Sequence, residues 1–183
     1  MGNRALGDRL PARARPLAAL WTLMSPFVPM LFMGEEYGEQ RPFQFFTDHI
    51  DPFIADATRE GRRNEFADFA GFEGEVPDPQ DPATAARSVL DQASGDPALR
   101  SLYRRLIALR AELPRTDASV TSDAERGWIA LDRGPVTVVG NFLEEPSQVP
   151  VGEGRELVLA TSPEAALDGG LLGLPALSGA VLR

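Results

Sequence analysis

The segment from Pro16 to Gly34 carries no charged residue, and the prolines inside it constrain the fold more than any other feature of the sequence. An uncharged segment of this length is compatible with a membrane span or a signal peptide. Ser25-Pro26 and Pro29 interrupt it in the middle, however, and a spanning helix must satisfy its own backbone hydrogen bonds, which two nearby prolines make difficult. We therefore predict no membrane role, and instead a buried helix followed by a buried strand.

The two halves of this segment have different apolar patterns. Before Ser25-Pro26, large apolar residues recur at the spacing of one helical face, at Leu17, Leu20, Trp21 and Met24. After it, residues 28–33 form a continuous apolar run, which predicts a short strand covered on both faces, as in a parallel sheet. A helix, a short loop, a buried strand and a polar loop follow one another in the order typical of an α/β fold.

Residues 40–97 form a long connection that is rich in Pro, Gly, Asp and Phe. Connections of this length in compact domains are often functional. Asp81-Pro82 predicts a short helix that continues to Leu90, since Asp is a common N-cap and Pro a common first helical residue. Asp96-Pro97 predicts a second helix that ends at Leu113-Pro114, with an apolar face made of Leu99, Leu102, Tyr103, Leu106 and Ile107.

Beyond Arg115 the pattern changes to short apolar runs separated by Gly and Pro. Such runs predict a small antiparallel sandwich with strands at residues 128–131, 136–142, 156–160 and 179–182. We therefore predict an α/β domain over residues 1–114 and a β domain over residues 115–183. The first domain has too few strand-like segments to cover its helix stripes, so we expect part of it to precede Met1.

Charge and composition argue against several classes of function. The net charge of −9 disfavours a nucleic-acid partner, because phosphate backbones are bound by clustered Lys and Arg. The chain has no cysteine and a single histidine, so it offers no disulfide frame and few ligands for zinc. We predict no metal site, no cofactor and a cytoplasmic location.

Glu35 and Glu36 directly follow the apolar run and are the first candidates for chemistry. Paired carboxylates hydrolyse glycosides when they face each other across a bond, about 5 to 10 Å apart. Adjacent residues that leave a strand point to opposite faces, so these two cannot easily flank one bond. We expect one of them to hydrogen-bond a neighbouring loop and the other to be solvated.

The loop that follows offers a second set of candidates. Asp48-His49 contains the only histidine and could contact a substrate, although consecutive side chains seldom form a catalytic pair. Phe43 and Phe45 alternate, while Phe46 points the other way, so at least one aromatic ring is available to a pocket. Because sugar rings pack their C–H faces on aromatic side chains, a stacking role is plausible.

The motif FMGEEYG, from Phe32 to Gly38, resembles the eighth barrel strand of the α-amylase superfamily. Its continuation RPFQFFTDH, from Arg41 to His49, resembles specifically the malto-oligosyltrehalose trehalohydrolase family of glycoside hydrolases. So do GRRNEF, from Gly61 to Phe66, and PDPQDP at residues 77–82. The resemblance runs from Gly2 to the last predicted strand and is least specific in the β domain.

The resemblance implies the C-terminal end of a (β/α)8 TIM barrel followed by a small antiparallel β-sandwich domain. It implies a retaining hydrolase that cleaves the α-1,4-glucosidic bond next to a terminal trehalose, with an Asp nucleophile, a Glu acid/base and a second, stabilising Asp at the ends of barrel strands. In this family an Asn-His-Asp motif with the last acid precedes a Gly-Asn-Arg like Gly2-Asn3-Arg4. We therefore expect the catalytic acids upstream of Met1 and this chain to be inactive alone.

The resemblance also implies that the motif and its loop form the rim of an active site that accepts malto-oligosyltrehalose or a related α-glucan. The substrate-binding residues that it predicts are Asn3, Arg4, Glu35, Glu36, Tyr37, Phe45, Asp48 and His49. Two alternatives remain open: a fragment of a glucan branching enzyme, which has a similar strand, and a non-catalytic glucan-binding module.

Overall fold

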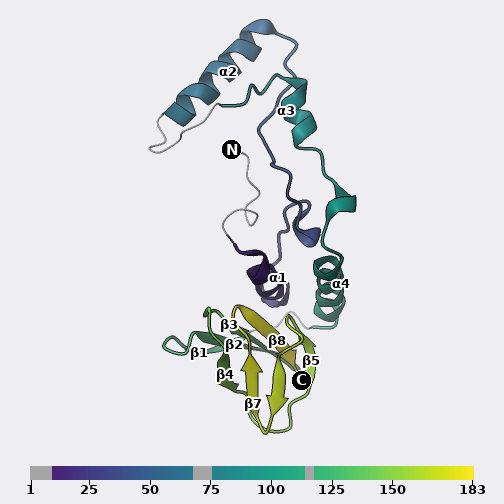
Figure 1. Cartoon of the computed structure of the whole chain (residues 1–183), viewed down its shortest axis with the longest axis vertical. Coiled ribbons are helices and arrows are strands. Elements are labelled where there is room, and N and C mark those ends of the chain that lie inside the picture. Colours follow the sequence, from purple (N-terminus) through teal and green to yellow (C-terminus); the bar gives the residue numbers. More distant parts are fainter. Residues whose placement is uncertain (1–9, 68–75, 114–117) are drawn as a thin grey trace. The chain divides into compact units, whose positions relative to one another are not determined.

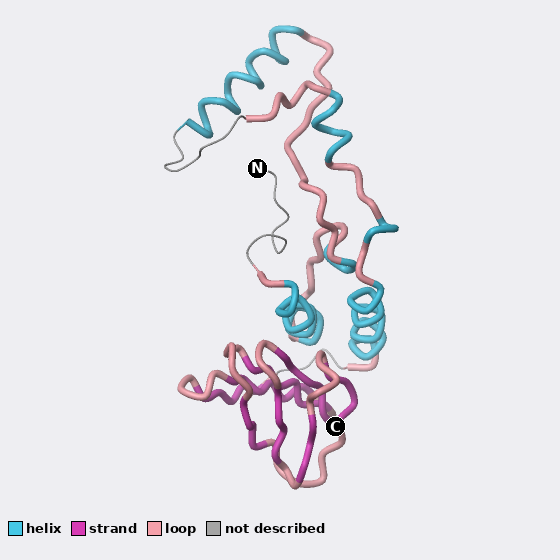
Figure 2. Tube along the Cα trace, in the orientation of Figure 1, coloured by secondary structure: helices cyan, strands magenta, loops and turns pink. Residues whose placement is uncertain are grey.

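The computed structural model describes residues 10–67, 76–113 and 118–183. Contacts divide them into two units, one of residues 10–38 and 96–183 and the other within residues 39–95 (Figures 1 and 2). This division differs from the predicted one at residue 114, because helices that precede this position pack with the strands that follow it. The division into a barrel part and a β domain stays a prediction.

The first unit contains a sandwich of two antiparallel sheets, as predicted (Figure 1). In the larger sheet the order is β1 (Ser119–Asp123), β2 (Trp128–Arg133), β3 (Val136–Asn141), β8 (Ser178–Leu182) and β5 (Leu157–Ala160). In the smaller sheet it is β4 (Ser147–Pro150), β7 (Leu171–Leu174) and β6 (Ala166–Asp168). The sequence predicted β2, β3, β5 and β8, whereas β1, β4, β6 and β7 were missed because they are short or mostly polar.

The central strands β3 and β8 of the larger sheet are buried on both faces, so alternate residues enter two different cores. One core lies between the sheets and includes Trp128, Val139, Val149, Leu172 and Leu182. The other lies on the opposite face of the larger sheet, where Leu131, Val138 and Val181 meet two helices. The larger sheet is therefore the middle layer of this unit.

The two helices on this outer face are α1 (Arg15–Met24) and α4 (Pro97–Ala111). Leu17, Leu20 and Met24 of α1 are buried as predicted, and so is Leu23, which the helical pattern did not include. On α4, Leu99, Tyr103 and Leu106 are buried, but Ile107 is 50% exposed, so its assignment to the apolar face was wrong. The β domain covers both helix stripes, contrary to the expectation that the chain cannot bury them.

A glycine pair lets α1 approach the sheet closely. Gly140 of β3 and Gly179 of β8 are cross-strand partners on neighbouring strands. A Cβ at Gly140 would lie 2.3 Å from Trp21 Nε1, and a Cβ at Gly179 would lie 2.5 Å from Leu20 Cδ2. The absence of side chains at these two positions thus sets the distance between helix and sheet.

Two arginines hold the end of α1. Arg133 of β2 is 1% exposed and donates hydrogen bonds from Nη1 to the carbonyl oxygens of Met24 (3.1 Å) and Ser25 (3.0 Å). Arg110 of α4 donates to the carbonyls of Leu23, Ser25 (2.7 Å) and Phe27 (2.7 Å). The carbonyls of Leu23, Met24 and Ser25 are those that the C-terminus of α1 leaves without intrahelical partners, whereas Phe27 lies beyond the helix. The positive charges also suit the helix dipole.

Residues 28–33 do not form the predicted buried strand. Val28 and Met30 are 91% and 90% exposed, and no described segment pairs with this run. A strand is defined by hydrogen bonds to a neighbouring strand, and this run forms no ladder among the described residues, although Leu31 is partly buried against the core of the first unit. The apolar composition was recognised correctly, but the burial inferred from it is absent among the described residues.

The second unit contains helices and loops, and no strand among its described residues (Figure 2). Helix α2 (Pro52–Ala67) lies within the long connection, where the sequence did not predict it. Helix α3 (Pro82–Arg87) ends three residues before Leu90, the predicted end of the short helix. The ends of the connection are joined by Glu39, which is 3% exposed and accepts hydrogen bonds from the backbone amides of Arg41 (2.9 Å) and Asp91 (2.6 Å). No helix of the described residues is long and apolar enough to cross a membrane.

Candidate functional site

The carboxylate pair lies on a short 3-10 helix, η2 (Glu35–Tyr37), and not on a strand end. Gly34 (φ 87°) and Gly38 (φ 70°) flank it, both in the left-handed region that favours glycine. A Cβ at Gly38 would also lie 2.9 Å from Arg15 Nη1. The two glycines of the motif thus turn the chain sharply into and out of the acidic segment.

Glu35 has a structural role in this unit. Its Oε1 accepts a hydrogen bond from the hydroxyl of buried Tyr103 (3.1 Å), and its Oε2 accepts one from the backbone amide of Phe32 (3.1 Å). Burial, and then the negative charge of Glu35, raise the pKa of Tyr103 above its ordinary value. The glutamate that bonds its surroundings is therefore Glu35, and its partners are helix α4 and the loop that contains Phe32.

This contact predicts that the unit loses stability in alkali. Because the pKa of Tyr103 is raised on folding, the folded chain keeps the phenolic proton above pH about 10, where the unfolded chain loses it. The stabilisation is complete below pH 10 and is lost as the pH rises above it, by at most about 1.4 kcal/mol per pH unit. Urea unfolding of Tyr103→Phe should show a shallower alkaline slope than the unsubstituted chain, and parallel slopes would contradict the assignment.

Glu36 and Tyr37 differ in what they offer to a ligand. Glu36 is half-buried and makes no hydrogen bond or ion pair with the described residues. The Tyr37 ring is 2% exposed and lies under the Arg100 guanidinium, 4.9 Å from the ring centroid. The Tyr37 carbonyl accepts from the backbone amide of Asp96 (2.8 Å), the residue that caps α4. Of these two predicted substrate contacts, Glu36 is accessible, and the burial of Tyr37 favours a packing role.

Phe45, Asp48 and His49 lie on one loop of the second unit, and all three are exposed. Backbone amides of this loop are held by the segment that returns from α2. Gln44 N donates to Ser88 Oγ (2.9 Å), Thr47 N to the Pro79 carbonyl (2.8 Å), and His49 N to Gln80 Oε1 (3.1 Å). The backbone of the loop is thus held while the side chains of Asp48 and His49 make no hydrogen bond or ion pair with the described residues.

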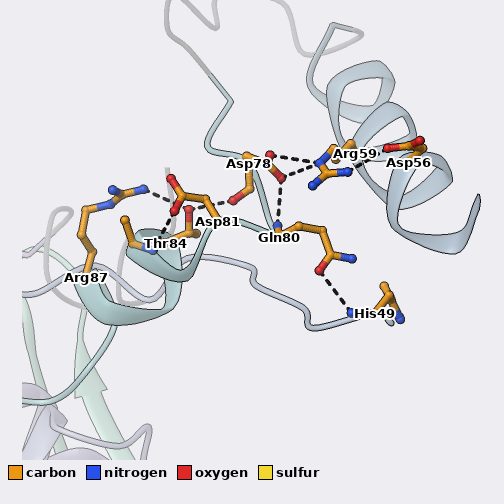
Figure 3. A network of polar contacts seen from close by, with 9 residues as sticks. His49, Asp56, Arg59, Asp78, Gln80, Asp81, Thr84 and Arg87 are labelled. Carbon is orange, nitrogen blue, oxygen red and sulfur yellow. Dashed lines mark hydrogen bonds and ion pairs between the residues drawn. The ribbon is translucent and has the colours of Figure 1, made fainter. Parts of the chain in front are cut away.

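Asp78 is the centre of the network that holds this loop (Figure 3). Its carboxylate accepts from the Gln80 amide (2.9 Å) and from Arg59 Nε of α2 (3.0 Å to each oxygen). Its carbonyl accepts from Thr84 Oγ1 (2.7 Å) of α3. The amide of Gln80, and then Arg59, lower the pKa of Asp78, so this carboxylate stays ionised as the partner of Arg59.

Phe45 is supported by a cation–π contact. The Arg62 guanidinium of α2 lies 4.8 Å from the centroid of the Phe45 ring and 4.5 Å from that of Phe66. Phe45 itself stays 47% exposed. The ring therefore has one neighbour that orients it and enough free surface to stack on a sugar.

The second unit thus presents an aromatic ring, a carboxylate and an imidazole on a held backbone. Among the described residues no three His, Asp or Glu side chains are grouped as metal ligands. An aromatic platform with a few polar groups beside it is the arrangement that neutral sugars use, through stacking and hydrogen bonds to hydroxyls.

The comparison with known proteins decides the family. No family model matches the chain. A malto-oligosyltrehalose trehalohydrolase from Rhizobium sp. (strain M-11) is 47% identical over the whole chain, and one from Brevibacterium helvolum is 44% identical over the whole chain. The chain belongs to the malto-oligosyltrehalose trehalohydrolase family. It spans 33% of the length of each of these two relatives and matches their carboxy-terminal third.

Solved structures confirm the predicted fold class, the end of a (β/α)8 barrel followed by a β-sandwich. A structure titled putative alpha amylase from Salmonella typhimurium is 35% identical and superposes with a TM-score of 0.75. The match covers the whole of this chain and 33% of the Salmonella chain. A mutant of trehalulose synthase MutB in complex with sucrose shares the fold at 21% identity and a TM-score of 0.61. This match covers 98% of this chain and 41% of the MutB chain.

Within this trehalohydrolase-family chain, the predicted site residues fall into three groups. Asn3 and Arg4 lie outside the described residues. Glu35, Glu36 and Tyr37 belong to the first unit, and Phe45, Asp48 and His49 to the second. The sequence did not point to the supporting residues Arg59, Asp78 and Gln80. An Asp side chain that accepts from the backbone amide two residues later is a known turn signal, and Asp78 and Gln80 have this spacing.

Proposed function

We propose that this chain is the carboxy-terminal part of a retaining glycoside hydrolase that cleaves the α-1,4-glucosidic bond next to a terminal trehalose and releases trehalose. The identity of 47% to a malto-oligosyltrehalose trehalohydrolase over the whole chain carries the proposal. The catalytic Asp and Glu residues come from the part of the enzyme that precedes this chain. The proposed ligand is malto-oligosyltrehalose, and the proposed location is the cytoplasm.

The role of this chain in the reaction is to shape the side of the active site that accepts the sugar. Phe45 provides a stacking surface, while Asp48 and His49 provide hydrogen-bonding groups for hydroxyls. Glu36, Asn3 and Arg4 are further proposed contacts. Glu35 and Tyr37, which pack on α4, support the turn that carries Glu36. A branching enzyme or a binding module is less well supported, because both relatives named above are trehalohydrolases.

Trehalose release tests this proposal. The purified chain, incubated with malto-oligosyltrehalose, is expected to release no trehalose above background. Joined to the amino-terminal two thirds of the Rhizobium relative, it is expected to restore release. Phe45→Ala in this chimera should lower kcat/KM by about fivefold, since stacking on an aromatic ring is worth about 1 kcal/mol.

The outcomes separate the alternatives. Chain transfer without trehalose release by the chimera would support a branching enzyme. Binding of malto-oligosaccharides by the chain, without turnover by the chimera, would support a non-catalytic module. Turnover by the chain alone would contradict the assignment of the acids to the preceding part.

A further inference from the structure

We propose that Gln80 is a positioning residue for the sugar site, through its hold on the backbone of His49. The inference rests on the proposed function. Gln80 touches neither Asp48 nor the His49 ring by a described hydrogen bond; it acts through the main chain. Its Oε1 accepts from the His49 amide (3.1 Å), which lies between the two exposed residues Asp48 and His49 (Figure 3).

The hold matters because the pair has little else to orient it. Asp48 and His49 are exposed, and their side chains bond no described residue. No described side chain holds them, so the backbone sets where they are attached, and this backbone is tied by the His49 amide and by Thr47 N on the Pro79 carbonyl (2.8 Å). Both acceptors belong to residues 79–80, so a single turn holds the backbone that carries the pair.

Gln80 can do this because its own backbone is fixed. Its amide donates to Asp78 Oδ1 (2.9 Å), and Asp78 is bound by Arg59 of α2. Arg59 also pairs with Asp56 (2.7 Å), so α2, the turn and the loop form one continuous chain of charged and polar contacts. Held binding groups bind more tightly than mobile ones, because ordering them on binding costs free energy.

The same junction has hydrogen-bonding capacity left over. The side-chain atoms Thr47 Oγ1 and Gln80 Nε2 are buried and have no hydrogen-bond partner among the described residues. Buried polar atoms are nearly always paired in folded proteins. The side chains of the junction therefore do not satisfy it fully, and the main-chain bonds of the loop to Pro79 and Gln80 carry its hold.

The test uses the active chimera and compares three variants. Gln80→Leu removes the acceptor and keeps the approximate shape of the side chain, and Gln80→Glu keeps an acceptor oxygen. Thr84→Val removes the contacts of Thr84 Oγ1 with the Asp78 carbonyl and with Arg87, and leaves in place the bonds of residues 79 and 80 to the loop that bears His49. We expect Gln80→Leu to raise KM by about tenfold with kcat changed by less than about threefold, and Gln80→Glu to recover most of the loss. Thr84→Val, at a buried position, should lower stability and leave KM unchanged.

Amide hydrogen exchange at His49 gives a second readout, independent of activity. Exchange should be faster in Gln80→Leu than in the unsubstituted protein, and unchanged in Thr84→Val. An unchanged KM together with unchanged exchange in Gln80→Leu would overturn the inference, as would an equal rise in KM for Gln80→Leu and Thr84→Val, which indicates a merely structural network. If the unsubstituted chimera releases no trehalose, the proposed function fails, while exchange at His49 still decides whether Gln80 holds the loop.

Discussion

Replacing Gly179 by alanine is expected to lower the free energy of unfolding by about 3 kcal/mol, at the upper end of overpacking effects. A Cβ here would lie 2.6 Å from the carbonyl oxygen of Val139 and 2.5 Å from Leu20 Cδ2. The first of these atoms belongs to the backbone of β3, which cannot shift without disturbing its ladder to β8. The methyl group would therefore push α1 away from the sheet.

Urea unfolding followed by tryptophan fluorescence measures this effect, because Trp21 lies on α1 and Trp128 between the sheets. Gly173→Ala is the matched control on β7. The nearest atom to its Cβ would be Gln148 Nε2 at 3.2 Å, the end of an exposed side chain that can move. We expect a change within about 1 kcal/mol for the control. Equal effects at the two glycines would mean that close packing of α1 is not the cause.

Replacing Arg133 by methionine is expected to lower the free energy of unfolding by about 2 to 3 kcal/mol, since hydrogen bonds to charged groups each contribute about 1.5 to 3 kcal/mol. Methionine fills much of the same volume, so the loss is polar rather than a cavity. It removes the bonds to the Met24 and Ser25 carbonyls at the end of α1. The opposing effect is the desolvation of the buried guanidinium. Desolvation is the larger cause that lowers the pKa of Arg133, and the nearby positive charge of Arg110 is the smaller one.

The stability of Arg133→Met shows which effect is larger, the hydrogen bonds of the guanidinium or the cost of its desolvation. Arg133→Lys, which retains a charge but fewer donors, should fall between the arginine and methionine forms. Arg126→Met is the matched control, because Arg126 is 68% exposed and its ion pair with Asp123 is 3.8 Å long. We expect a change below about 0.5 kcal/mol for this exposed pair. A methionine variant as stable as the parent would show that burying the guanidinium costs as much as its hydrogen bonds contribute.

Local capping chemistry was readable from the sequence. Asp81-Pro82 and Asp96-Pro97 predicted the starts of α3 and α4, and in the structure each Asp side chain accepts from helix amides. The same signal at Asp51-Pro52 starts α2, where Asp51 accepts from Phe53 N (2.8 Å), yet this helix was missed. Its middle is polar and contains Gly61, so no apolar stripe revealed it.

The candidate site residues were named from the sequence and their role stays a prediction, whereas the residues that support them were not named. The motif and the loop were located from residue types and resemblance, and Phe45, Asp48 and His49 are exposed as a sugar contact requires. That Glu35, and not Glu36, is bonded to α4 depends on Tyr103, which is distant in the chain. No local pattern distinguishes two adjacent glutamates, because the distinction comes from a partner on another element.

The sequence by itself determined the family, the starts of α3 and α4, the main strands of the sandwich and the apolar character of residues 28–33. These follow from short-range chemistry: capping, proline geometry and side-chain period. The tertiary structure alone decided which apolar residues are buried. It covers the stripe of α1 with the larger sheet, through the gap left by Gly140 and Gly179, and leaves Val28 and Met30 exposed. Burial depends on whether another segment is present to pack or pair, and this is a property of distant residues and not of the run itself.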